Sequence, residues 1–98
     1  MTFYWRIVAT DEYYSLVSSL PLDIQDQIQN RWIETAKHEN PRDVGSTMTC
    51  SKHSEYVVVI FPGLTYEFLY KMDESERVIR LLSCERLTFL DHGQIDYP

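Results

Sequence analysis

The chain has 98 residues, the size of one ordinary domain and too short for two units that each bury a core. Hydrophobic residues make up 44% and charged residues 24%, a balance that excludes a disordered chain. The net charge of -6 repels phosphate, so we expect weak RNA binding unless a basic patch forms locally. These values predict one folded domain over residues 1–98, with no clear structural assignment for residues 87–98.

Targeting and metal-binding signals are missing from the sequence. No apolar run approaches the roughly 20 residues that span a bilayer, and the first residues lack the layout of a signal peptide. We therefore expect a cytoplasmic protein without membrane contact. Cys50 and Cys84 form no CxxC pair, which favours two buried apolar side chains over a disulfide framework or a zinc site. Neither a metal nor a cofactor is expected.

The first elements are a strand and a short helix. Residues 2–10 alternate and predict a strand that buries every second side chain from Phe3 to Ala9. Asp11 is placed to cap the helix that follows, and Pro21 ends it. One helix face is apolar: Tyr13, Leu16, Val17 and Leu20.

A second, longer helix begins near Asp23, which is placed to accept from free backbone N–H groups. Its apolar face carries Ile24, Ile28, Trp32, Ile33 and Ala36. Asn40-Pro41 ends the segment. Lys37 and His38 lie near the end of the helix, where a positive charge interacts favourably with the helix dipole.

The second half of the chain is rich in strands. Residues 47–51 predict a modest strand, and residues 56–61 are continuously apolar, which predicts a central strand buried on both faces. After the turn at Pro62-Gly63, residues 65–72 alternate as a third strand. Residues 77–83 are the last clear strand.

The resulting order is β-α-α-β-β-β, an α+β fold. Strands joined by tight turns run antiparallel, so we expect an antiparallel sheet. Two amphipathic helices can cover only one face of that sheet. The opposite face is therefore expected to be partly open.

Four local features, in this order and spacing, resemble the RelE/ParE toxin superfamily of bacterial toxin–antitoxin modules. They are Ser19-Leu20-Pro21, Asn40-Pro41, the run from Tyr66 to Asp73 that begins Tyr-Glu-Phe-Leu-Tyr, and Val78-Ile79-Arg80-Leu81-Leu82 leading to Arg86. The resemblance covers about residues 3–86 and implies the RelE/ParE-like fold.

In members of this superfamily that cleave messenger RNA on the ribosome, basic side chains on the open sheet face approach the scissile phosphate. This sequence has Arg86 at a family arginine, which would stabilise charge, and His92 near a terminal Tyr or His that can exchange a proton. It departs at residues 56–61, which carry no lysine, and at Glu67, which stands where the family has an arginine. The resemblance thus implies Arg86, His92 and Glu67 as the candidate catalytic residues.

Glu67 has two interpretations. In the first, Glu67 acts as a general base and Lys71 is its charge partner. Lys71 lies two pleats further along the strand, on the same face. Alternatively, Glu67 forms an ordinary cross-strand ion pair on the solvated face.

The resemblance implies two functions for the chain. The first is the toxin of a type II toxin–antitoxin pair, bound by an antitoxin and, if enzymatic, a metal-free, ribosome-dependent mRNA endonuclease. The second is a catalytically inactive relative that binds a protein partner. Ribosome and mRNA are expected partners only of the first, and both a monomer and a dimer remain open.

Overall fold

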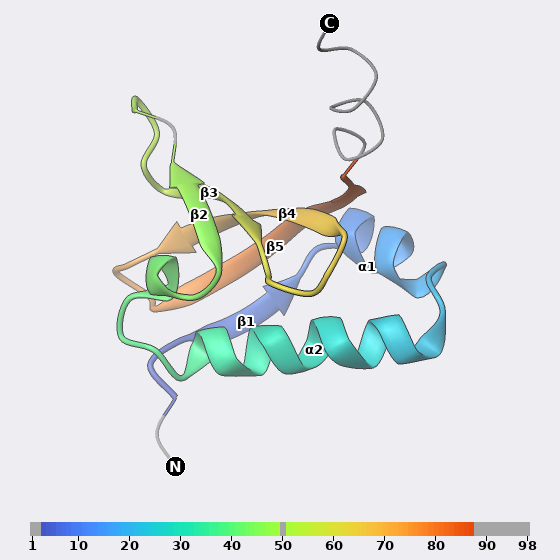
Figure 1. Cartoon of the computed structure of the whole chain (residues 1–98). Coiled ribbons are helices and arrows are strands. Elements are labelled where there is room, and N and C mark those ends of the chain that lie inside the picture. The colour runs from blue at the N-terminus through green and yellow to red at the C-terminus, as the bar shows by residue number, and fades with distance from the viewer. Residues whose placement is uncertain (1–2, 50, 88–98) are drawn as a thin grey trace, which may run out of the picture.

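The computed structural model describes residues 3–49 and 51–87, which form five strands and two α-helices (Figure 1). The elements in chain order are β1 (Arg6–Ala9), α1 (Asp11–Ser18), α2 (Leu22–Ala36), the 3-10 turn η1 (Pro41–Asp43), β2 (Ser46–Thr49), β3 (Tyr56–Ile60), β4 (Tyr66–Asp73) and β5 (Val78–Arg86). The predicted α+β class is confirmed. The modest strand forms as β2 and gives the sheet a fifth strand.

The sheet has the order β1-β5-β4-β3-β2. The strands β2 to β5 form the predicted antiparallel meander. β1, in contrast, pairs with β5 in parallel, so the sheet is mixed. β1 is free to pair in parallel because two helices, and no hairpin, connect it to the rest of the sheet.

Both helices begin differently from the sequence prediction. Thr10, not Asp11, caps α1, because its side-chain oxygen accepts from the Tyr13 backbone N–H at 3.3 Å. Pro21 occupies the corresponding position of α2 and makes no side-chain cap. Asp11 and Asp23 instead lie in the first turns, where a negative charge interacts favourably with the helix dipole.

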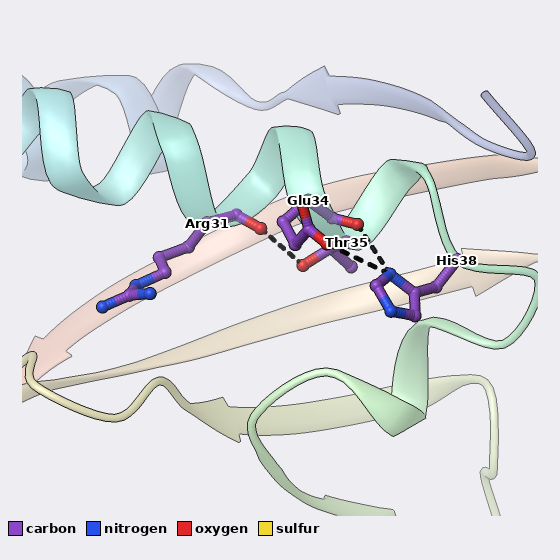
Figure 2. Close-up of polar contacts among 4 residues, drawn as sticks. All are labelled: Arg31, Glu34, Thr35 and His38. Atoms are coloured by element: carbon purple, nitrogen blue, oxygen red, sulfur yellow. Dashed lines mark hydrogen bonds and ion pairs between the residues drawn. The ribbon is translucent and has the colours of Figure 1, made fainter. Parts of the chain in front are cut away.

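The C-terminal part of α2 satisfies its own polar groups (Figure 2). The hydroxyl of buried Thr35 donates to the Arg31 carbonyl at 2.7 Å. The His38 Nδ1 lies 2.9 Å from the Glu34 carbonyl oxygen, which also accepts from the Lys37 backbone N–H at 3.1 Å. The predicted place of His38 at the helix terminus is confirmed.

Trp32 of α2 is the centre of the core. Its ring packs edge-on against Phe61, Phe68 and Tyr70, with centroid distances of 5.1, 5.5 and 5.6 Å. Its indole N–H donates to the Tyr13 hydroxyl of α1 at 2.7 Å. These contacts bring both helices and three aromatic residues of the meander into one cluster on a single face of the sheet.

The prediction that residues 56–61 are buried on both faces is wrong. Val57 and Val59 are 0% and 1% exposed and lie under the helices, whereas Tyr56, Val58 and Ile60 are only half-buried on the other face. No helix in the described ranges covers that second face, and β4, not β3, is the middle strand. No described helix is long and apolar enough to cross a membrane.

A matched pair of substitutions tests this orientation of β3. Val59→Asp places a carboxylate in the aromatic core and should cost several kcal/mol, enough to unfold a protein of typical stability. Val58→Asp places it on the half-exposed open face and should cost clearly less, about 1 to 2 kcal/mol. Urea unfolding followed by circular dichroism measures both, and equal losses would contradict the assigned faces.

Candidate functional site

Glu67 lies on the open face of β4, between two neighbouring strands. Its cross-strand partner on β3 is Ile60, and its partner on β5 is Glu85. Residues directly opposite one another share a face and have Cβ atoms about 5 Å apart. Two carboxylates therefore face each other at this end of the open face.

A β-bulge at Leu82 determines which side chains of β5 reach that face. The register pairs Tyr70 with Leu81 but Leu69 with Ser83, so Leu82 is an extra residue without a partner on β4. One inserted residue exchanges the faces of all residues that follow it. Glu85 consequently lies on the open face beside Glu67.

The same bulge separates Glu67 from Arg86. Arg86 pairs with Tyr66, whose ring packs against the core cluster on the helix side of the sheet. The exposed Arg86 side chain therefore begins on the face opposite to Glu67. The structure does not bring these two predicted site residues together, and the third, His92, lies outside the described residues.

Lys71 shares the open face with Glu67, as the sequence predicts, but the predicted ion pair between them is not formed. Its Nζ lies 5.6 Å from the ring centre of Tyr56 on β3, and its partner on β5 is Arg80. Within 3–49 and 51–87, the close contacts between basic and acidic side chains join histidines to glutamates, and none involves a Lys or Arg. Two cations thus face each other at the second end of the open face.

Arg80 also influences the carboxylate at the end of β4. The pKa of Asp73 is lowered chiefly because the Ser75 hydroxyl donates to it at 2.8 Å, with a further hydrogen bond from the Glu76 backbone N–H. The positive charge of Arg80 lowers this pKa further, as the smallest contribution. Asp73 therefore stays ionised at neutral pH within the turn.

Sequence reasoning missed the partners Glu85 and Arg80. A regular strand would place Cys84, not Glu85, opposite Glu67, so the pairing depends on the bulge. The available signal was the adjacent apolar pair Leu81-Leu82, which breaks the alternation expected of a strand.

The chemistry at the acidic end does not suit a phosphate. A hollow of about 160 Å³ lies there, lined by Val58, Glu67, Phe68, Leu69, Ser83 and Glu85. A phosphate oxygen about 4 Å from a carboxylate is repelled by roughly 1 to 4 kcal/mol, depending on the local dielectric. The hollow accommodates a cationic or neutral group instead.

Neither thiol nor metal chemistry is apparent in the described part of the chain. Burial raises the pKa of the Cys84 thiol to about 11, so it is not a thiolate at neutral pH. This agrees with the predicted buried role of Cys84, whereas Cys50 lies outside the described residues. In the described ranges, no three His, Cys, Asp or Glu side chains are grouped so that they could hold a metal ion.

A second feature lies on the helix side, where α1, α2 and β1 enclose a groove of about 560 Å³. Its lining is mostly apolar, with Gln25, Asp26 and Gln29 as polar members. Several lining side chains are substantially exposed: Phe3, Tyr14 and Ile33. An apolar groove with exposed aromatic side chains is typical of a protein-binding site.

The groove adjoins the outer edge of β1. The Arg6 and Thr10 backbone N–H groups donate toward β5, to the carbonyls of Arg77 and Leu81, at 2.9 and 3.1 Å. Because alternate residues face opposite neighbours, Ile7 and Ala9 direct their backbone groups away from β5. No described strand pairs with this edge.

Comparisons with known proteins agree with the architecture. No protein-family model matches the chain. No curated protein matches it either. Solved structures match over most of its length.

Three solved structures illustrate the match. The toxin–antitoxin complex RelBE2 from Mycobacterium tuberculosis matches with 18% identity over 87% of this chain and 99% of that chain, with a TM-score of 0.59. The archaeal RelE–RelB complex from Pyrococcus horikoshii matches with 13% identity over 86% and 96%, with a TM-score of 0.69. A mutant of the E. coli toxin RelE in the free state matches with 12% identity over 95% and 93%, with a TM-score of 0.68.

Because the sequence identities are only 12% to 18%, the similarity to these structures is a similarity of fold. The chain has an α+β fold in which two helices lie on one face of a five-stranded mixed sheet. That fold is the RelE fold, and the resemblance seen in the sequence is confirmed at this level.

Proposed function

We propose that the chain is the toxin component of a type II toxin–antitoxin pair, acting in the cytoplasm, and that an antitoxin segment occupies the groove between α1, α2 and β1. The observation that carries this proposal is the apolar groove beside the outer edge of β1. Two of the matching structures are complexes, one the toxin–antitoxin complex RelBE2 and the other a RelE–RelB complex. Apolar lining and an available strand edge suit a partner segment that buries side chains and adds backbone hydrogen bonds.

The negative charge of the chain indicates which residues the antitoxin segment should carry. Asp26 lies in the groove, and the whole chain carries a net charge of -6. A segment with apolar side chains flanked by Lys or Arg complements both features. The antitoxin is accordingly expected to be basic where it meets the groove.

Ile33→Glu tests the groove. Ile33 is 39% exposed and lines the groove, so a carboxylate there should weaken antitoxin binding at least about tenfold without unfolding the protein. Leu22→Glu is the matched control, because Leu22 lies on the same helix, is 77% exposed and does not line the groove. Calorimetric titration with the antitoxin encoded beside the gene measures both, and wild-type affinity of Ile33→Glu would exclude the groove as the docking site.

Ribosome-dependent cleavage of mRNA is the second candidate function. It is supported by the exposed guanidinium of Arg86 at the end of β5, which is available to a phosphate. In this role Arg86 stabilises the charge on the phosphate, and His92 exchanges a proton. Glu67 contributes nothing to the same centre if its side chain keeps to the opposite face.

Primer extension on a translated message tests the cleavage. We expect none from the free protein and slow cleavage on translating ribosomes. Arg86→Ala should then reduce the rate by about 10²-fold, the effect of removing one electrostatic stabiliser. His92→Gln should alter the pH profile, and Glu67→Ala should leave the rate unchanged.

Two outcomes separate the alternatives. Cleavage that Arg86→Ala retains in full would refute the role of Arg86. No cleavage in any sample, with the antitoxin still bound, would favour the catalytically inactive partner-binding protein.

A further inference from the structure

Two pairs of like charges lie directly opposite each other on the open face of the sheet, whose far end also carries Asp73 and Arg6. Glu67 faces Glu85 at one end, and Lys71 faces Arg80 at the other. Like charges directly opposite each other on neighbouring strands are destabilising. The described residues 3–49 and 51–87 supply no Lys, Arg or carboxylate counter-ion within ion-pair distance of either pair.

The two pairs lie symmetrically about the middle of β4. Leu69, which pairs with Ser83, is two residues from Glu67 and two residues from Lys71. The charged pairs are thus about 13 Å apart, four residues at about 3.3 Å each. Half-buried Val58 and Leu82 contribute further apolar surface between them.

From this symmetry we infer that two copies of the chain associate through their open faces. A two-fold axis that lies between the faces, perpendicular to β4 and beside Leu69, places Glu67 of one copy over Lys71 of the other. The same rotation places Glu85 over Arg80. Each pair of like charges then faces opposite charges on the second copy. Because both copies use the same face, the assembly stops at two chains.

Repulsion between like charges excludes a dimer whose two-fold axis runs parallel to β4. An axis parallel to β4 would place the two acidic pairs over each other, and likewise the two basic pairs. The hollow of about 160 Å³ between Glu67 and Glu85 accommodates the Lys71 ammonium group of the second copy in the first arrangement only. The inference rests on these charges and is independent of the proposed toxin function.

The size of the face sets the strength of the association. β4 has 8 residues and is therefore about 26 Å long, and four neighbouring strands span roughly 19 Å. Each copy thus buries about 500 Å², and the pair about 1,000 Å², at the lower limit for a specific interface. A reversible dimer with a dissociation constant in the micromolar range is expected.

Sedimentation equilibrium of the full chain, from 1 μM to 1 mM, tests the dimer. The wild type is compared with two double variants in which one pair of charges is reversed. Glu67→Lys with Glu85→Lys makes both opposed pairs basic, and Lys71→Glu with Arg80→Glu makes both pairs acidic. Each double variant should associate at least about tenfold more weakly than the wild type. Their equimolar mixture should recover the wild-type association, because every charge then meets its opposite.

Control variants carry the same changes in net charge away from the open face. They are Glu39→Lys with Glu76→Lys, and Lys37→Glu with Lys52→Glu, and both should dimerise as the wild type does. Circular dichroism of every variant verifies its fold. A wild type that stays monomeric at 1 mM would overturn the inference, as would a mixture that fails to associate. Both results are expected if the remainder of this chain or a different protein covers the face.

Discussion

The pairing of β4 with β5 governs both faces of this protein. It extends over eight residue pairs and contains one extra residue, Leu82, in β5. Before the bulge, Leu81 and Ile79 face the helices, and after it Cys84 takes that side. The core therefore stays apolar along the whole of β5, although the sequence does not alternate regularly. The same inserted residue places Glu85 on the open face and Arg86 on the helix side.

The helical layer depends on the same sheet face, since Trp32 packs there against three aromatic rings and holds α1 through the Tyr13 hydroxyl. Sequence patterns predicted this layer well, because the apolar spacing of α2 and the alternation of β4 report directly on burial. The same patterns predicted the wrong environment for Val58. A continuous apolar run occurs both in strands buried on two faces and in strands whose second face is apolar but half-exposed. The patterns also missed the parallel pairing of β1, which depends on contacts distant in sequence.

The candidate site was less predictable than the fold. Glu67 and Lys71 share a face by simple alternation, and this much the sequence predicted. The relation of Glu67 to Arg86 depends on a register shift that no local pattern specifies, apart from the pair Leu81-Leu82. The hollow beside Glu67 is acidic and unsuited to a phosphate, whereas the groove on the helix side is mostly apolar.

The most direct test of this account is the register of β4 and β5 in solution. Nuclear Overhauser contacts between backbone protons across the two strands report which residues lie opposite one another. The account predicts contacts of Lys71 with Arg80 on one side of Leu82 and of Glu67 with Glu85 on the other. Contacts of Glu67 with Cys84 would show an uninterrupted register and contradict it, because Glu85 would then lie on the helix side and Arg86 on the open face.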